Sequence, residues 1–282
     1  NLQLLLLFQL SLCCFLFFML MILLIIFTTL GLFKLMNTIK LKNWKIKYID
    51  KVDSTMDEIL KDKYKQYNNI FIFCGEQVKG RGRGKNKWVS QKGNLFASIK
   101  TRILLKDKHY LISYVVGIII YDVIKKYLPK KENIIIKWPN DILVNKKKIA
   151  GILIEMSSIG KSIDEVIIGI GLNILKSPNI KGYNSICLRE LTNIKSDINI
   201  IIKGILNYLE RWKKYLNEDK SSIKYIINQW MKRSIEVGTV LEVKNQDKIF
   251  SGIYKGIGMD GGIKLLIGKK IKNFYNLQII SF

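Results

Sequence analysis

The spacing of apolar and polar positions divides the chain into three parts. Residues 4–33 are almost wholly apolar and uncharged, a run long enough to span a bilayer. The middle of the chain mixes short β-like runs with longer segments of helical period, and the last part has only short strands with polar or glycine turns. The pattern therefore predicts domains at 1–35, 36–233 and 234–282.

The apolar run 4–33 leaves two interpretations open. It is longer than a typical signal-peptide core, so it predicts a membrane anchor or an organelle-targeting leader. Met36 follows it directly, and translation from that residue would omit it. The protein is accordingly expected in the cytoplasm, or in an organelle reached through the secretory route if the leader is made.

Short apolar runs in the middle part predict strands, and segments of helical period predict helices. The expected strands cover residues 41–52, 70–74, 94–99, 134–136, 142–144, 148–155 and 165–170. The expected helices cover residues 54–64, 111–128, 199–216 and 221–230. In the last part we expect strands at residues 239–244, 248–254, 262–267, 270–274 and 277–281. The fold class is therefore α+β, followed by a small all-β domain.

A glycine- and arginine-rich loop separates two of the expected strands. Between residues 80 and 84 three glycines alternate with Arg81 and Arg83, and Lys85, Lys87 and Trp88 follow. Glycines let the backbone approach a ligand closely, and arginine matches carboxylate and phosphate groups. A phosphate-bearing small molecule, a nucleic-acid backbone or a solvated basic turn each fits this loop.

Composition narrows the chemistry. The formal net charge is +25, but lysines are spread along the whole chain, which favours a generally basic surface over a dedicated nucleic-acid face. Such a surface would associate with acidic partners. The four cysteines form no CxxC pair and His109 is the only histidine, which excludes a structural zinc site and argues against a histidine base.

The segment Lys137-Trp138-Pro139-Asn140-Asp141 follows a short buried strand. Pro139 fixes the backbone and biases Trp138 toward an extended conformation, so Asn140 and Asp141 are held at a defined place at a strand end. Glycines within the next two strands, at Gly151 and in residues 169–171, indicate close approach by a ligand or another backbone.

Seven segments taken together resemble the biotin–protein ligase family, in that family's order and spacing. They are residues 53–55, 80–83, 88–90, 93–95, 137–141, 148–155 and 169–173. The β-rich tail also resembles the family's C-terminal domain. The resemblance implies a mixed-sheet catalytic domain of the class II synthetase-like biotin/lipoate ligase type, followed by a small SH3-like β-barrel.

The resemblance also implies a two-step reaction. Biotin and ATP, with Mg²⁺, would give biotinyl-5′-adenylate, and the biotinyl group would then pass to a lysine in the acceptor domain of a biotin-dependent carboxylase such as acetyl-CoA carboxylase. The residue types agree, because attack of a carboxylate on a phosphate needs charge neutralisation and positioning more than a protein nucleophile.

The resemblance assigns roles to individual residues. Catalytic roles fall on Lys148, Arg83 and Asp141, and Asp141 would orient magnesium or the acceptor lysine. Biotin-binding roles fall on Ser54, Thr55, Gln77, Arg81, Gly82, Arg83, Lys148 and Gly151. Adenylate-binding roles fall on Arg81, Arg83, Trp88, Asn140 and Asn173.

The chain departs from the family pattern at two places. Met56 replaces a polar residue, and Gly84-Lys85-Asn86 stands where the family has a Gly/Arg-rich triplet. Nothing before Asp53 resembles a helix-turn-helix, so no specific DNA binding is expected. A lipoate-type ligase, a catalytically weakened biotin-binding protein and an RNA-binding module are the alternatives. The sequence is also compatible with a homodimer and with membrane association through residues 4–33.

Overall fold

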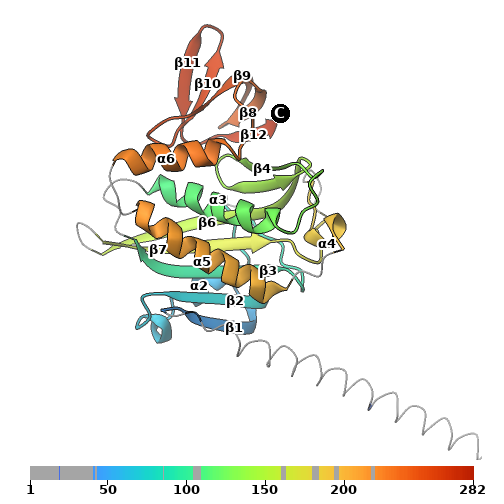
Figure 1. Ribbon diagram of the computed structural model, residues 1–282, viewed down its shortest axis with the longest axis vertical. Helices are drawn as coiled ribbons and strands as arrows, with labels where there is room; N and C mark the ends of the chain where they lie inside the picture. Colours follow the sequence, from blue (N-terminus) through green and yellow to red (C-terminus); the bar gives the residue numbers. More distant parts are fainter. Residues whose placement is uncertain are drawn as a thin grey trace, which may run out of the picture. The chain divides into compact units, whose positions relative to one another are not determined.

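Seven strands form one mixed sheet at the centre of the computed structural model (Figure 1). They are β1 (Lys45–Val52), β2 (Ile70–Gln77), β3 (Leu95–Ile103), β4 (Ile134–Lys137), β5 (Asp141–Val144), β6 (Lys147–Ile159) and β7 (Ile163–Leu172). Their order across the sheet is β1-β2-β3-β7-β6-β5-β4. Among these described strands only β1 and β2 pair in parallel. All seven strands expected in the middle part are present.

Residues 19, 41, 43–84, 86–103, 109–159, 163–179, 184–193, 197–216 and 220–282 are described by the structure. Apart from Met19, the apolar run 4–33 lies outside them. In this described part no helix has both the length and the apolar character needed to cross a membrane. The domain boundaries expected from the sequence stay predictions.

Three long helices lie beside the central sheet. α3 (Tyr110–Lys125) packs on β4, β5 and β6, and α5 (Ile198–Leu216) packs on β3. Both lie on the same face of the sheet in Figure 1. α6 (Lys220–Met231) contacts α3, α5 and the C-terminal sheet. α3 is apolar on nearly every side because it is enclosed by the sheet and the other two helices.

A short helix carries the first predicted site residues. α2 (Thr55–Glu58) begins at Ser54, whose hydroxyl accepts a hydrogen bond from the Met56 amide, as expected for an N-cap. The expected helix to residue 64 is wrong beyond Glu58. Lys61 takes an extended backbone conformation, and a single 3₁₀ turn, η1 (Asp62–Tyr64), follows.

Five antiparallel strands form the C-terminal sheet. They are β8 (Val240–Asn245), β9 (Lys248–Ile257), β10 (Ile263–Ile267), β11 (Lys270–Phe274) and β12 (Gln278–Ser281), in the order β11-β10-β9-β8-β12. Each corresponds to an expected strand. The sheet is tied to the rest of the chain through Tyr110 and Tyr114 of α3, whose hydroxyls donate to the carbonyls of Met259 and Gly261.

Candidate active site

One large cleft, of about 1520 Å³, gathers the residues that the sequence singled out. It is lined by α2, the basic loop, strands β4 to β7 and the end of the C-terminal sheet. Every residue assigned to the site lines it: Ser54, Thr55, Gln77, Arg81, Gly82, Arg83, Trp88, Asn140, Asp141, Lys148, Gly151 and Asn173. These residues come from segments that are far apart in the sequence, so their convergence is a property of the fold.

A buried polar network forms one end of the cleft. The amide and the hydroxyl of Thr55 both donate to Gln77 Oε1, at 2.9 and 3.1 Å. Ser98 donates to the Thr55 hydroxyl at 2.8 Å, and Gln77 Nε2 donates to Ser90 at 3.1 Å. The network joins α2, β2, β3 and the basic loop. Its donors and acceptors are therefore held in fixed directions at the cleft wall.

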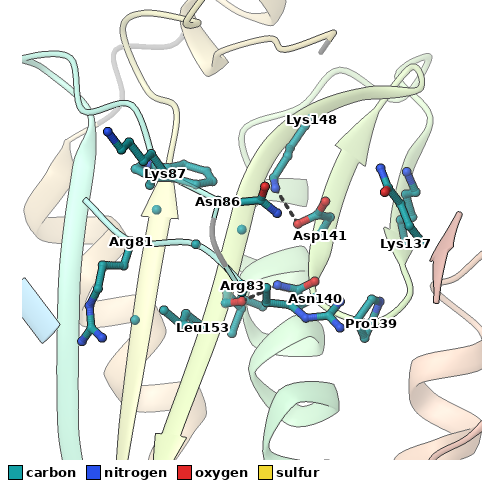
Figure 2. Close-up of a pocket in the computed structure, with 18 of the residues that line it drawn as sticks. Arg81, Arg83, Asn86, Lys87, Lys137, Pro139, Asn140, Asp141, Lys148 and Leu153 are labelled. Atoms are coloured by element: carbon teal, nitrogen blue, oxygen red, sulfur yellow. Dashed lines mark hydrogen bonds and ion pairs between the residues drawn. The ribbon is translucent and has the colours of Figure 1, made fainter. Parts of the chain in front are cut away.

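An ion pair lies deeper in the cleft, between the first residue of β5 and the second residue of β6. Lys148 Nζ lies 2.7 Å from Asp141 Oδ1, and both side chains are mostly buried (Figure 2). Lys137, at the end of β4, is the cross-strand neighbour of Asp141. Burial lowers the pKa of the Lys137 ammonium, an effect that the charge of Lys148 adds to and that of Asp141 opposes.

Hydrogen bonds on the neighbouring backbone hold the Lys148–Asp141 pair in place. Asn140 Nδ2 donates to the carbonyl of Ile152 at 2.6 Å, and the Ile152 amide donates back to the Asn140 carbonyl at 3.0 Å. The Lys148 amide donates to the main-chain carbonyl of Asn184 at 2.9 Å. The carboxylate and the ammonium are therefore positioned by main-chain bonds on both sides.

The basic loop is a narrow hairpin over the cleft. Arg81 and Lys87 form an antiparallel bridge, and the Trp88 amide donates to the Gly80 carbonyl at 2.9 Å. The two arginines lie in different surroundings. Arg83 Nη2 donates to Asn276 Oδ1 at 3.4 Å, whereas Arg81 forms ion pairs with Asp57 of α2 and Glu155 of β6.

Gly151 and Gly171 leave room for the indole of Trp88. A Cβ atom at Gly171 would lie 2.3 Å from Trp88 Cε2, and one at Gly151 would lie 2.7 Å from Trp88 Cζ3. Lys148 Nζ lies 5.2 Å from the ring centroid. The close approach expected from these glycines is thus made by Trp88. The assignment of Gly151 to biotin stays a prediction and would require the indole to shift.

Asn173 brings an amide to the far wall of the cleft. Its Nδ2 donates to the Ile186 carbonyl at 3.1 Å, and its side chain is buried. No described residue donates a hydrogen bond to Asn173 Oδ1. A buried acceptor of this kind is costly unless a ligand or water satisfies it, so this atom is suited to receive a polar group of a ligand.

The cleft also contains residues that the sequence reasoning did not select. Lys137 and Lys146 line it, as do Lys244, Gln246 and residues 275–282 of the C-terminal sheet. Lys137 belongs to the Trp-Pro motif and could have been chosen with it. The C-terminal residues carry no comparable signal, because their place depends on how the second sheet packs against the first.

A resident metal site does not emerge from these residues. In the described part of the chain no group of three His, Cys, Asp or Glu side chains could hold a metal ion. Asp141 is already paired with Lys148, and Lys137 is its strand neighbour, so the local charge is positive. This environment suits a phosphate better than a cation. The assignment of Asp141 to magnesium stays a prediction.

Solved structures share this fold and define its class. The biotin protein ligase from Aquifex aeolicus in complex with biotin and ATP aligns with a TM-score of 0.68 at 23% identity, covering 83% of this chain and 99% of that chain. The biotin protein ligase from Leishmania major in complex with biotin aligns with a TM-score of 0.58 at 21% identity, covering 82% and 98%. The mixed sheet followed by a small antiparallel sheet is thus the fold of these two structures, as the sequence predicted.

Sequence comparison then identifies the family. Residues 48–173 match the biotin/lipoate A/B protein ligase family. The chain is 29% identical to the biotin–[acetyl-CoA-carboxylase] ligase of Paracoccus denitrificans, over 76% of this chain and 91% of that protein. It is 30% identical to the bifunctional ligase/repressor BirA of Bacillus subtilis, over 74% of this chain and 65% of that protein. Residues 48–173 thus belong to the biotin/lipoate A/B protein ligase family.

Proposed function

We infer that this protein is an ATP-dependent biotin–protein ligase of the biotin–[acetyl-CoA-carboxylase] type. The observation that carries the inference is the single cleft that a polar network, an arginine-rich loop and the Lys148–Asp141 pair all line. Relatives whose names or solved complexes include biotin and ATP support it. The cleft is large enough for two substrates, since single-ligand sites are typically about 300–1,000 Å³.

In the proposed first step, a carboxylate oxygen of biotin attacks the α-phosphorus of ATP. A phosphorus–oxygen bond forms, the bond to the departing pyrophosphate breaks, and biotinyl-5′-adenylate results. Negative charge gathers on the phosphate oxygens, and the Lys148 ammonium and the Arg83 guanidinium would stabilise it. Ser54, Thr55 and Gln77 would hold the opposite end of biotin.

In the proposed second step, the amine of an acceptor lysine attacks the carbonyl of the adenylate. AMP leaves, an amide forms and the lysine nitrogen loses its proton. Asp141 would orient the incoming amine, while Asn173 Oδ1 and Trp88 would border the adenine. The acceptor would be a biotin carboxyl carrier domain of a carboxylase, as the name of the Paracoccus relative suggests.

Magnesium would bind together with ATP. Mg²⁺ commonly binds through substrate phosphates and retained water molecules, with one or two carboxylates from the protein. Asp141 is the carboxylate that the sequence assigned to it. Lys137 and Lys148, which lie beside Asp141, would neutralise charge on the phosphates.

Biotin-dependent exchange of pyrophosphate into ATP tests the first step. Lys148→Ala should lower the exchange rate by about 10²–10³-fold, because it removes a charge that stabilises the transition state. Lys147→Ala is the matched control, since Lys147 is exposed and does not line the cleft. Equal activity of the two variants would contradict the assignment of Lys148.

The same assay separates the alternatives. Lipoate should not compete with biotin for exchange, and effective competition would favour the lipoate-type activity that the family also contains. Biotin binding without exchange in the parent protein would favour a catalytically weakened biotin-binding protein.

A further inference from the structure

The stem of the basic loop is hydrogen-bonded like a short hairpin. The Gly82 amide donates to the Asn86 carbonyl at 2.8 Å, and the Trp88 amide donates to the Gly80 carbonyl at 2.9 Å. Arg81 lies opposite Lys87 in this stem. An isolated two-stranded hairpin is marginally stable in water, so the loop needs contacts with the rest of the protein to keep one position.

Arg81 supplies such contacts to two elements beside the loop, α2 and β6. One guanidinium nitrogen, Nη1, lies 2.9 Å from Glu155 Oε1 in β6. The other, Nη2, lies 3.1 Å from Glu155 Oε2 and 2.8 Å from Asp57 Oδ1 in α2. The contact with Glu155 is therefore bidentate, the geometry in which arginine and carboxylate interact most strongly.

The direction of the side chain separates Arg81 from the reacting centre. In Figure 2 Arg81 points away from the Lys148–Asp141 pair, whereas Arg83 lies beside Asn140. The charge of Arg81 is balanced by two carboxylates, which also repel an anionic ligand. Arg83 instead donates to the neutral carboxamide of Asn276, so its charge remains available for an anion.

We propose that Asp57 and Glu155 are positioning residues that clamp Arg81 and so fix the loop across the cleft before substrates bind. The proposal rests on the proposed function for its kinetic consequences. In this proposal the two arginines have different roles: Arg81 anchors the loop and Arg83 contacts the substrate.

The clamp has a definite consequence for binding. A loop that already lies in place loses less conformational freedom when biotin and the adenylate bind beneath it. Removing one carboxylate should therefore raise the KM for biotin and speed escape of the adenylate. It should leave the turnover number nearly unchanged, because neither carboxylate touches the Lys148–Asp141 pair.

Hydrogen–deuterium exchange of the ligand-free protein tests the clamp without reference to catalysis. In Glu155→Gln and Asp57→Asn, the amides of Gly82 and Trp88 should exchange roughly three- to tenfold faster than in the parent. Glu76→Gln is the control. It removes a 3.0 Å ion pair with Lys51 of β1, and its glutamate is about as exposed as Glu155, at 39% against 35%.

Kinetics and a charge swap complete the test. Both clamp variants should raise the KM for biotin roughly three- to tenfold, with a turnover number within about twofold of the parent. Arg81→Glu should abolish loop protection, and Arg81→Glu combined with Glu155→Arg should partly restore it. Unchanged amide exchange in both carboxylate variants would overturn the proposal, as would a lowered turnover number with an unchanged KM. Absent activity in the parent would contradict only the proposed function, since the exchange of amides would still report on the clamp.

Discussion

Two buried thiols lie near the cleft but are poorly suited to chemistry. Cys74, in β2, is 2% exposed, and burial raises the pKa of its thiol to about 12. Burial and the nearby Glu190 carboxylate raise the pKa of Cys187 to about 11. At neutral pH both side chains are therefore thiols and not thiolates, and a thiolate is the nucleophilic form. This agrees with an adenylation that proceeds without a covalent link to the protein.

The reactivity of these thiols can be measured directly. At pH 8 we expect Cys74 and Cys187 to resist iodoacetamide in the folded protein and to react fully in urea. Peptide mass spectrometry distinguishes them from Cys13 and Cys14. Rapid labelling of Cys74 in the folded state would show that β2 opens readily at this position.

At the scale of single residues the sequence predicted residues that line the cleft but not their contacts. Lys148, Asp141 and Thr55 belong to local motifs, so their presence in a cleft could be inferred from the resemblance. The partners of Arg81 could not, because Asp57 and Glu155 are brought to it by two elements that are distant in the sequence. The stacking of Trp88 on Gly171 is non-local in the same way.

At the scale of elements, the end of α2 is held by the side chain of Glu58. Glu58 is buried, and its carboxylate contacts Lys61 at 2.5 Å, Lys63 at 2.8 Å and the Tyr64 hydroxyl at 3.1 Å. Burial alone would raise the pKa of Glu58, but these three partners outweigh it and lower the pKa. The same contacts pull the chain out of the helix after one turn, which the local helical period could not reveal.

The sign of the Glu58 effect follows from this lowered pKa. The stability it contributes is present above the unfolded carboxyl pKa of about 4.3 and is lost as the pH falls through the folded value. Glu58→Gln should therefore lower the free energy of unfolding by about 1–3 kcal/mol at pH 7 and much less at pH 3. Urea titration at both pH values measures this. Asp62→Asn, which removes an exposed pair with Lys65, is the control and should not reproduce the loss.

At the scale of the molecule, the C-terminal sheet completes the cleft. Residues 275–282 line it, Asn276 accepts a hydrogen bond from Arg83, and Lys146 donates to the Phe282 carbonyl at 2.7 Å. The expected five strands are all present, because the turns that separate them are marked by local polar and glycine residues in the sequence. Their role in the site was not predicted, because sheet-to-sheet packing leaves no periodic signal in the chain.

Tyr114 is a junction between the two sheets. Its hydroxyl donates to the Gly261 carbonyl and accepts from Trp138 Nε1 at 3.1 Å. Burial raises its pKa, so the hydroxyl remains a donor through the working pH range. Tyr114→Phe should lower the free energy of unfolding by about 1–3 kcal/mol, because it leaves a buried indole N–H without its partner.

Urea unfolding of Tyr114→Phe, followed by tryptophan fluorescence, measures that loss. Tyr225→Phe serves as the control, because Tyr225 is 42% exposed and contributes ring contacts that the substitution preserves. Equal stability of the two variants would mean that the hydroxyl bonds at Tyr114 do not hold the sheets together.

The strand order also sets the sequence of events during synthesis. β1, β2 and β3 are synthesised first, but β7, which pairs with β3, is synthesised only after β4, β5 and β6. The cleft is lined on both sides of the β3–β7 pairing, where Ala97 is paired with Ile170. A nascent chain therefore cannot form the proposed biotinyl-5′-adenylate until β3 and β7 have paired. The part of the cleft lined by β12 is completed last.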